Sequence, residues 1–271
     1  MQTQIFYPPL HLRKYIRFFW TMDYNEPVHC QTMLKVFACR FPRLVIQHYN
    51  GRSAITRGND LLPTVFLSGL HTQPCTLSFG HSISLTGVSF YPAAIMDLLG
   101  LEAVDLTDKF PAFNTNASRY LSEELTDLVS HQQRIALITH YFSARLGRVR
   151  PQTFLTPGAV NRIGKKDDDS TIHELVKTFK ISERQLERRF RAVVGFGPKQ
   201  FLRITRFEKG VDLIHQDQHS NLSDIAFELN YADQSHFIRE FKEFSGYTPK
   251  QFANQPKLTT DTSSMLIRVA I

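Results

Sequence analysis

Apolar residues recur at helical spacing along the last third of the chain. Ser170 and Ser182 stand where N-caps are preferred, and Gly195 stands where a helix commonly ends. The pattern therefore predicts two helices joined by a tight turn at Lys180 and Ile181. The first apolar stripe comprises Ile172, Leu175, Val176 and Phe179, and the second comprises Leu186, Phe190 and Val193.

A second helix pair with the same layout follows. Asn221 and Asp233 are the N-caps of its helices, and Gly246 closes the second one. Asn230 falls at the turn, where a residue that tolerates positive φ is suited. Pro198 begins a connecting helix that we expect to run to about residue 215. The apolar stripes here are Leu222, Ile225, Ala226 and Leu229, and then Phe237, Phe241 and Phe244.

The two helix pairs form a sequence repeat with a constant offset. Two copies are too few for a solenoid, which needs at least three to bury a continuous core. Two helical units on one connecting helix suit a ligand that repeats itself, as B-DNA does about every 34 Å along one face. The matching residues are Gly195, Pro198, Lys199, Gln200 and Phe201, which recur as Gly246, Pro249, Lys250, Gln251 and Phe252.

Basic residues lie opposite the apolar stripe of the second helix in each unit. A helix-turn-helix needs this arrangement, because one face docks on its own domain and the other enters the major groove. For a single copy, a merely solvated basic face is an equally good explanation. Two copies with matching caps, stripes and closing glycines favour DNA binding. The residues opposite the stripes are Arg184, Arg188 and Arg191 in the first unit and Ser235, Arg239 and Lys242 in the second.

Several runs carry a resemblance to a known family. They are Ser182–Phe190, Gly195–Pro198, Asp224–Ala226 with Tyr231, Asp233–Phe237, Phe241–Lys242 and Gly246–Pro249. With them, the segment from about Pro157 to Asn254 resembles the DNA-binding domain of the AraC/XylS family of bacterial transcription regulators. This segment is a little over a third of the chain. The chain departs from the family at the first turn, which is often Gly and is Lys180 here.

The resemblance implies one recognition helix in each unit, with contacts to double-stranded DNA at promoter sites. The residue types suit these roles: Arg can bind guanine in bidentate fashion, Gln can pair with adenine, and Glu can accept from cytosine. The implied DNA-binding residues are Arg184, Gln185, Glu187, Arg188, Arg191 and Lys199 in the first unit, and Gln234, Ser235, His236, Arg239 and Lys242 in the second.

The charge balance adds little to this picture. The 271 residues carry a formal net charge of +7, which agrees with an anionic partner. Residues 156–255, however, hold 16 Lys and Arg against 14 Asp and Glu. Long-range steering is therefore weak, and the case for DNA rests on the basic faces of two helices.

Residues 1–112 are predicted to be strand-rich. Val36–His48 and Thr64–Leu70 are β-branched or aromatic runs, and Cys75–Phe90 alternates in short pieces around two glycines. Leu10–Trp20 is aromatic and basic, and we expect a helix covering a sheet edge there. Gly87, Phe90 and Pro92 precede a predicted short helix. With this element the segment resembles the cupin-like N-terminal sensor domains of some AraC-type regulators.

The predicted fold class is α+β, with a strand-rich cupin-like domain followed by an all-α double helix-turn-helix domain. Residues 113–148 are expected to be helical with a break near Ser130; they either dimerise, as such helices often do in the family, or pack on the N-terminal sheet. The predicted divisions are a sensor domain at 1–112, the helical segment at 113–148, a linker at 149–156, the DNA-binding domain at 157–255 and a tail at 256–271.

Enzymatic and metal chemistry find little support in the sequence. Three cysteines form no framework, and the scattered histidines lack ligand spacings such as HExxH or CxxC. No cofactor, metal or catalytic residue is therefore expected. Neither a signal peptide nor an apolar run long enough for a membrane span occurs, so a soluble, cytoplasmic protein without a membrane partner is expected.

Two function classes remain open. The first is a sequence-specific transcription regulator that responds to a small-molecule effector through its N-terminal half, acts with RNA polymerase and can form a homodimer. The second is a DNA-binding module attached to an enzymatic or DNA-repair domain. The first class is preferred, because the N-terminal half lacks the cysteine cluster and the Gly-x-Ser-x-Gly elbow that the enzymatic alternatives need.

Overall fold

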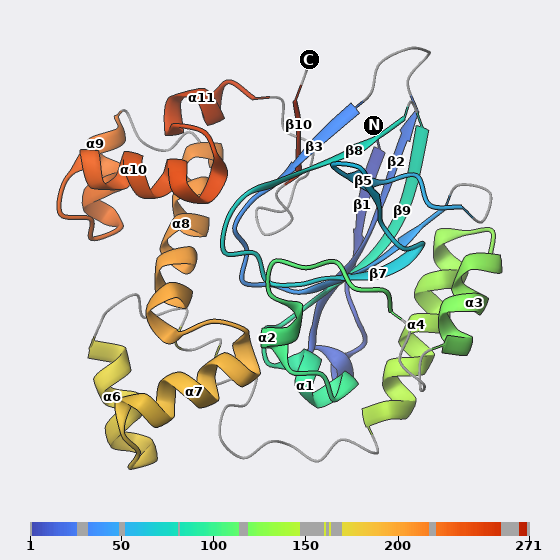
Figure 1. Ribbon diagram of the computed structural model, residues 1–271, viewed down its shortest axis with the longest axis horizontal. Helices are drawn as coiled ribbons and strands as arrows, with labels where there is room; N and C mark the ends of the chain where they lie inside the picture. The colour runs from blue at the N-terminus through green and yellow to red at the C-terminus, as the bar shows by residue number, and fades with distance from the viewer. Residues whose placement is uncertain are drawn as a thin grey trace.

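The computed structural model describes most of the chain. The described residues are 2–25, 32–48, 52–80, 82–113, 119–146, 170–216, 221–255 and 266–269, together with Val160 and Ile163. The linker predicted at 149–156 and most of the predicted tail lie outside this set. The strand-rich half lies beside the helical half, so that the two sheets stand between the helices of residues 170–253 on one side and those of residues 119–146 on the other (Figure 1).

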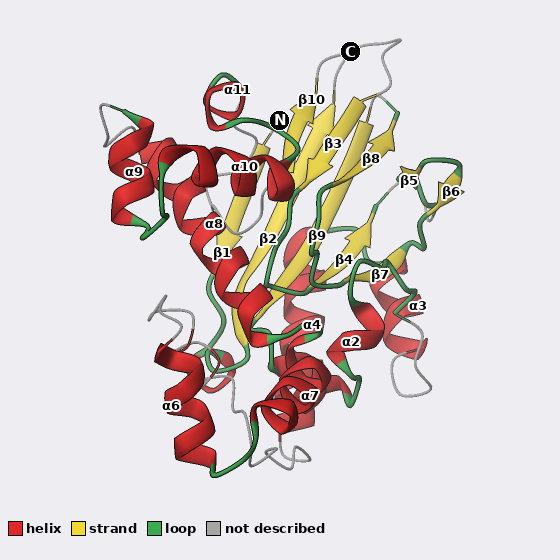
Figure 2. Cartoon of the chain, turned by 60° about the vertical axis from the view of Figure 1, so that its left-hand side comes forward, coloured by secondary structure: helices red, strands yellow, loops and turns green. Residues whose placement is uncertain are grey.

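Two five-stranded antiparallel sheets face each other in the strand-rich half (Figure 2). The first has the order β1 (Gln2–Phe6), β2 (Ile16–Asn25), β9 (Ser82–Phe90), β4 (Arg43–Gln47) and β7 (Val65–Ser68). The second has the order β10 (Leu266–Val269), β3 (Thr32–Val36), β8 (Cys75–Phe79), β5 (Thr56–Arg57) and β6 (Asp60–Leu61). The chain thus returns from the helical half to cover the edge of β3 with β10.

The first sheet is buried on both faces, as the side-chain alternation of β2 shows. Phe18, Trp20 and Met22 point into the core between the two sheets. Phe19, which lies between them in sequence, points to the opposite face and joins a second core. Because successive strand residues face opposite sides, a run such as Phe18–Met22 can fill two cores at once.

Two helices cover that second face, α3 (Arg119–Asp127) and α4 (His131–Leu146). Leu125, Ile138 and Phe142 are fully buried and share a core with Val88 and other residues of the sheet. The predicted break near Ser130 is present between the two helices. Of the two roles considered for this segment, packing on the sheet is the one observed, and dimerisation remains a prediction.

The helical half contains the two predicted helix pairs. The first is α6 (Ser170–Phe179) and α7 (Glu183–Val194), and the second is α9 (Leu222–Glu228) and α10 (Gln234–Ser245). They are joined by α8 (Pro198–Gln216) and followed by α11 (Pro249–Ala253). The predicted stripes of α7 and α10 are buried throughout. The α+β class is therefore confirmed.

One local prediction is wrong. Leu10–Trp20 was expected to be a helix, but only Leu10–Leu12 form a short 3-10 turn, and β2 begins at Ile16. A strand forms here because it places successive aromatic residues on opposite faces of the sheet, where each is buried in a core. Gly87, expected to interrupt a strand, lies inside the continuous strand β9, opposite Trp20.

An apolar interface joins the two halves. Phe37 and Ala38, which follow β3, belong to the same buried core as the helices of the helical half. The ring of Phe37 lies 5.7 Å from the ring of Phe252 in α11 and 6.4 Å from that of Tyr247. Leu70 and residues of two short helices, α1 (Ala94–Leu99) and α2 (Ala103–Leu106), complete this shared core.

The close approach of Trp20 to Gly87 yields a stability prediction. A Cβ at Gly87 would lie 2.0 Å from Cε2 of the indole, whereas a Cβ at Gly80 would meet nothing within 4 Å. We expect Gly87→Ala to lower the free energy of unfolding by about 1–3 kcal/mol through overpacking. Urea unfolding measures the change. Gly80→Ala is the matched control and should stay close to wild type; equal effects of the two substitutions would contradict the packing argument.

Candidate nucleic-acid interface

Side-chain caps fix the start of each candidate recognition helix. In α7, Ser182 Oγ accepts from the backbone N–H of Gln185 at 3.2 Å, and the Gln185 side chain accepts from the N–H of Ser182 at 3.0 Å. In α10, Asp233 accepts from the N–H of His236 at 2.8 Å. The capping box occupies the only side-chain oxygen of Gln185, a residue that the family resemblance assigns to DNA contact.

Left-handed residues shape the turns and ends of both units. Gly195 and Gly246 end α7 and α10 with φ values of +95° and +78°, as predicted for closing glycines. The tight turns hold Lys180 at φ +49° and Asn230 at φ +55°. Asn230 confirms the sequence prediction, and Lys180 shows that this chain forms the same turn with a side chain that disfavours it.

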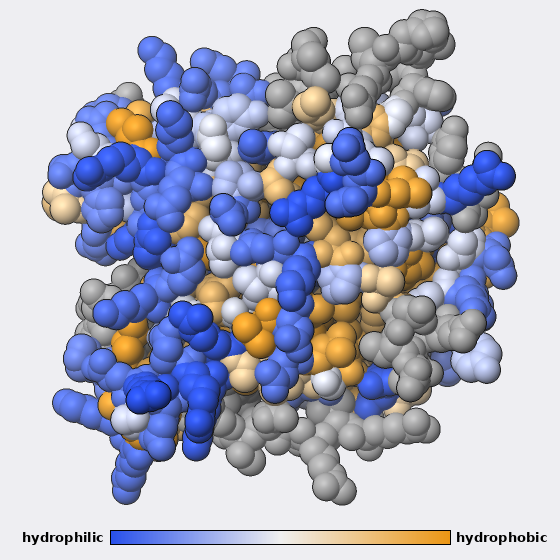
Figure 3. Space-filling view, in the orientation of Figure 1, coloured by the Kyte–Doolittle hydropathy of each residue, from blue (hydrophilic) through white to orange (hydrophobic). Residues whose placement is uncertain are grey.

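The outer face of α7 is exposed and strongly polar. Arg184, Gln185, Arg188 and Arg191 are exposed, and hydrophilic side chains gather over α6 and α7 at the lower left of Figure 3. Glu187 is half-buried and accepts from Arg191 Nε at 2.9 Å.

Glu187 also lies against the turn between α7 and α8. A Cβ on Gly197 in this turn would approach its Oε1 to 2.2 Å. Glu187 thus faces Arg191 and the turn, while Arg184 and Arg188 are exposed. Lys199, in the first turn of α8, is exposed as well.

The face of α10 is divided between outward and inward contacts. Ser235, Arg239 and Lys242 are exposed. The amide oxygen of Gln234 accepts from Ser223 Oγ at 2.9 Å. The His236 side chain turns toward Glu240, one turn further along the same helix, and its Nε2 lies 3.9 Å from that carboxylate.

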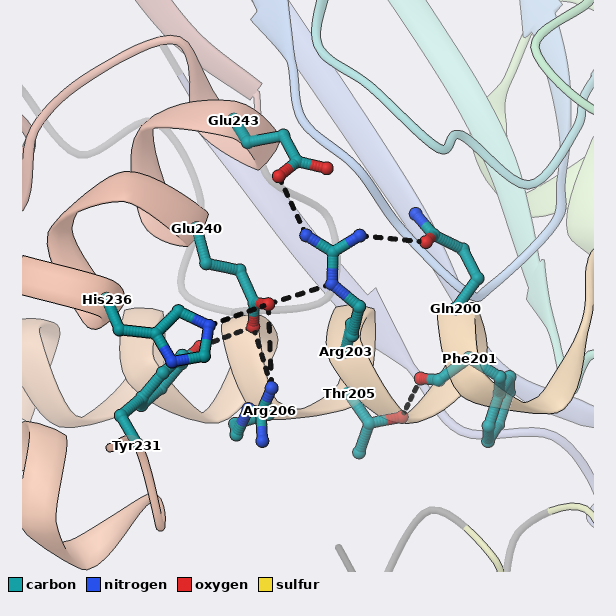
Figure 4. A network of polar contacts seen from close by, with 9 residues as sticks. All are labelled: Gln200, Phe201, Arg203, Thr205, Arg206, Tyr231, His236, Glu240 and Glu243. Carbon is teal, nitrogen blue, oxygen red and sulfur yellow. Dashed lines mark hydrogen bonds and ion pairs between the residues drawn. The ribbon is translucent and has the colours of Figure 1, made fainter. Parts of the chain in front are cut away.

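A buried carboxylate, Glu240, ties α10 to the connecting helix α8 (Figure 4). It accepts from Arg203 Nε at 2.8 Å, from Arg206 at 3.2 Å and from the Tyr231 hydroxyl at 2.8 Å. Burial, and then the charge of Glu240, raise the pKa of Tyr231, so the phenol stays protonated and donates. These bonds fix the angle between α8 and α10.

A second buried carboxylate, Glu208, lies on α8 itself and contacts the strand-rich half. Arg40 donates to it twice, from Nε at 2.7 Å and from its backbone N–H at 3.1 Å. Arg40 Nη1 also donates to Thr205 at 3.2 Å. We call the contacts of Arg40 with Glu208 and Thr205 the Arg40 clamp.

Both candidate recognition helices are held at their C-terminal ends. Thr107 Oγ1 donates to the carbonyl of Gly195 at 3.0 Å, where α7 ends. The N–H of Ala38 donates to the carbonyl of Phe244 at 2.9 Å, where α10 ends. The strand-rich half thus contacts both units and leaves their N-terminal turns exposed.

The sequence interpretation missed Glu208 and Glu240, although a local signal exists. Glu240 follows Phe237 by three positions and precedes Phe244 by four, so it lies on the buried stripe of its helix. Glu208 follows Ile204 by four positions and precedes Val211 by three, so it also lies on a buried stripe. An acidic residue on an apolar stripe predicts a buried, paired carboxylate.

Other kinds of site find no support in the described residues. Among them, no group of three or more His, Cys, Asp and Glu side chains is placed to hold a metal ion. Within the same part of the chain, no helix combines the length and apolar character that crossing a membrane requires.

Comparison with known families matches two segments of the chain. Residues 175–255 match the family model described as a helix-turn-helix domain. Residues 4–111 match a domain of unknown function, DUF6597. The two matches fall on the helical half and the strand-rich half respectively.

Individual relatives are similar over part of the chain. An uncharacterised HTH-type transcriptional regulator of Staphylococcus aureus is 29% identical over 150 residues, which are 52% of this chain and 20% of that protein. The HTH-type transcriptional regulator MtrA of Neisseria gonorrhoeae is 30% identical over 93 residues, 34% of this chain and 31% of MtrA. The chain thus spans a fifth to a third of the length of these relatives.

Among solved structures, ToxT from Vibrio cholerae matches with a TM-score of 0.47 and 12% identity. The match covers 87% of this chain and 97% of the ToxT chain.

The left-handed turn gives a prediction for Lys180. Replacing it with Gly removes a conformational cost of about 1–2 kcal/mol and adds about 0.5–1 kcal/mol of unfolded-state entropy. We expect Lys180→Gly to raise the free energy of unfolding by roughly 0.5–1 kcal/mol. Asn230→Gly should raise the free energy of unfolding by less than Lys180→Gly does, because Asn already tolerates this conformation. Thermal unfolding measures both, and a destabilised Lys180→Gly would show that the turn is not strained.

The Glu240 network gives a second prediction. Glu240→Gln leaves Arg203 and Arg206 without the charge that they share. We expect this substitution to lower the free energy of unfolding by about 2–3 kcal/mol. Glu243→Gln is the matched control, because Glu243 contacts the same Arg203 from the surface, at 2.7 Å and half-exposed. Glu243→Gln should lower the free energy of unfolding by less than about 1 kcal/mol. Chemical denaturation decides the question, and comparable losses at the two positions would refute the assignment.

Proposed function

Because residues 175–255 of this chain form an AraC-type helix-turn-helix domain, we propose that the protein is a sequence-specific DNA-binding transcription regulator. The observation that carries this proposal is the pair of capped helices, α7 and α10. Their N-terminal turns are polar and exposed, with Arg184 and Arg188 on α7 and Arg239 on α10, while their C-terminal ends are anchored. A helix-turn-helix contacts base edges mainly from the N-terminal residues of its recognition helix.

The connecting helix supports simultaneous binding by both units. α8 has 19 residues, which corresponds to about 28 Å at 1.5 Å per residue. Successive major grooves on one face of B-DNA lie about 34 Å apart. A rigid helix of this length, tied to α10 through Glu240, suits two recognition helices that enter neighbouring grooves.

The proposed contacts follow the exposure of each side chain. Arg184 and Arg188 of α7 and Arg239 of α10 are exposed arginines, the residue type that binds guanine in bidentate fashion. Phosphate contacts are assigned to the remaining exposed cations, because phosphate contacts position a protein without specifying sequence. Glu187, Gln185, Gln234 and His236 each have an intramolecular partner, and in the bound state they would have to exchange or share it.

The strand-rich half is proposed as the sensor of a small molecule. Its two facing sheets enclose a core with a cavity, and its contacts with α7, α8 and α10 connect that core to both units. We assign residues 1–112 to the sensor, 113–148 to the helical segment, 149–156 to the linker, 157–255 to the DNA-binding domain and 256–271 to the tail. Homodimer formation and contact with RNA polymerase belong to the same proposal.

A regulator is favoured over an enzyme with an attached DNA-binding module. The relatives named above are both HTH-type transcriptional regulators. Turnover of a substrate by the full chain would support the enzymatic alternative instead.

The two-helix proposal is tested by Arg188→Ala and Arg239→Ala. Each substitution should weaken specific binding by about 1–3 kcal/mol and relax base preference at one position of the site. The two positions should lie about one helical turn apart, because one helix connects the two units. Selection of bound sequences from a random DNA pool, carried out on each variant, measures the preference.

Lys199→Ala provides the control for a non-specific contact. It should weaken binding to all sequences alike and reduce the salt dependence of the affinity. If both arginine variants retained the wild-type base preference, neither arginine would read the sequence. If both lost it at the same base pair, the two units would not read separate positions. Either result would contradict the two-helix proposal.

A further inference from the structure

A groove opens on the surface of the strand-rich half, where the chain passes from β1 to β2. Its volume is about 400 Å³, which falls in the range of sites that bind ligands. Two arginines and two tyrosines line it, and the six described lining residues include no carboxylate. We call this site the basic groove. It is lined by Tyr7, Pro8, Arg13, Ile16, Arg17 and Tyr91.

Contacts within the chain orient both arginines of the basic groove. Arg13 Nε donates to the carbonyl of Pro8 at 3.0 Å. The guanidinium of Arg17 lies 3.7 Å from the ring centre of Phe41, and its Nη1 donates to Ser89 Oγ at 3.3 Å. A side chain that is already oriented loses less conformational freedom when it binds a partner. The two cations are therefore suited to bind an anionic surface.

The segment that lines the basic groove also exposes apolar side chains. Tyr7 and Leu10 are 77% and 78% exposed, and Lys14, in the same segment, is an exposed cation. Tyrosine and arginine are enriched at the centres of protein interfaces, where they carry much of the binding energy. The composition of this surface is therefore that of a contact with another protein chain.

A second exposed surface, on α3, carries the opposite charge. One aromatic residue and three carboxylates recur at i, i+3, i+4 and i+7, so they share one face of this helix. All four side chains are exposed, and the aromatic one, Tyr120, is 82% exposed. We call this surface the acidic face. It comprises Tyr120, Glu123, Glu124 and Asp127.

We infer that the acidic face of one copy of this chain binds the basic groove of a second copy. The inference deepens the homodimer part of the proposed function, because it names the two surfaces that meet. The carboxylates of the acidic face form charge-assisted hydrogen bonds with Arg13 and Arg17. The ring of Tyr120 packs on an arginine side chain in a cation–π contact.

Charge complementarity identifies the occupant as a second copy. Tyr120 and Tyr7 are both exposed in the same chain, so a single chain does not join its two surfaces. Two acidic faces repel each other, as do two basic grooves, because like charges are then placed opposite one another. Each surface therefore binds the other kind, and two chains related by a two-fold axis form the contact twice.

The position of α3 is compatible with DNA binding by the same dimer. α3 lies on the side of the sheets that faces away from α7 and α10 (Figure 1). A second copy bound to the acidic face therefore leaves the N-terminal turns of both candidate recognition helices uncovered.

Charge reversal tests the two surfaces in the full-length protein. We expect the wild type to associate as its concentration rises, measured by sedimentation velocity. Arg13→Glu and Glu124→Arg should each weaken association by about tenfold or more, because repulsion replaces attraction in both copies of the contact. Arg52→Glu reverses an exposed cation of the same half outside both surfaces and should leave association unchanged. A wild type that stays monomeric, or reversals without effect, would overturn the inference.

Mixing the two variants distinguishes this pairing from any other. The Arg13→Glu variant keeps its acidic face, and the Glu124→Arg variant keeps its basic groove. In a mixed dimer one contact is native and the other has its charges exchanged. An equimolar mixture should therefore associate as the wild type does, although neither variant does so alone. A mixture that associates no better than the separate variants would refute the pairing of these two surfaces.

Selection of bound DNA from a random pool separates this inference from the proposed function. A monomeric wild type that still selects a DNA sequence would refute the dimer contact and leave sequence-specific DNA binding in place. A wild type that associates through the two surfaces but selects no sequence would retain the contact and refute the proposed function.

Discussion

The helix α8 carries two buried carboxylate contacts on which the arrangement of the whole molecule depends. On one side, Glu208 on α8 accepts from Arg40 of the strand-rich half. On the other, Arg203 and Arg206 of α8 donate to Glu240 of α10. Removing the carboxylate from such a contact leaves the arginines without the charge that they share, which costs about 2–3 kcal/mol. Both pairs therefore resist rearrangement, and α8 acts as the common reference for the sheets and for the second helix pair.

Much of the helical half follows from local sequence signals. These signals act within one or two helical turns, so they can be recognised without knowing the fold. They are caps such as Ser182 and Asp233, closing glycines, and apolar stripes at i, i+4 and i+7. The sequence also indicated which face of α7 and α10 would be outward. It did not indicate that Glu187 and His236 would turn toward neighbours of their own domain, because those contacts depend on the path of the chain outside each helix.

The strand-rich half was harder to predict, for reasons that are also physical. Phe18, Phe19 and Trp20 give no period-two pattern, because the first sheet is buried on both faces and each residue fills a core. A short apolar run of this kind is ambiguous between helix and strand. The contacts of Arg40 and Thr107 with the helical half span more than eighty residues, and no local pattern encodes them.

The anchoring of both candidate recognition helices at their C-terminal ends has a mechanical consequence. Gly195 and Phe244 are the points at which the strand-rich half holds α7 and α10, each of which has 12 residues. Such a helix is about 18 Å long, so a rotation of about 5° about its fixed end displaces the other end by about 1.6 Å. That displacement is large compared with the tolerance of a hydrogen bond to a base edge. Each helix is therefore held at or near its C-terminal end, at Gly195 and at Phe244, and a small motion that the sheets transmit to that point becomes larger at the N-terminal end, where DNA would be contacted.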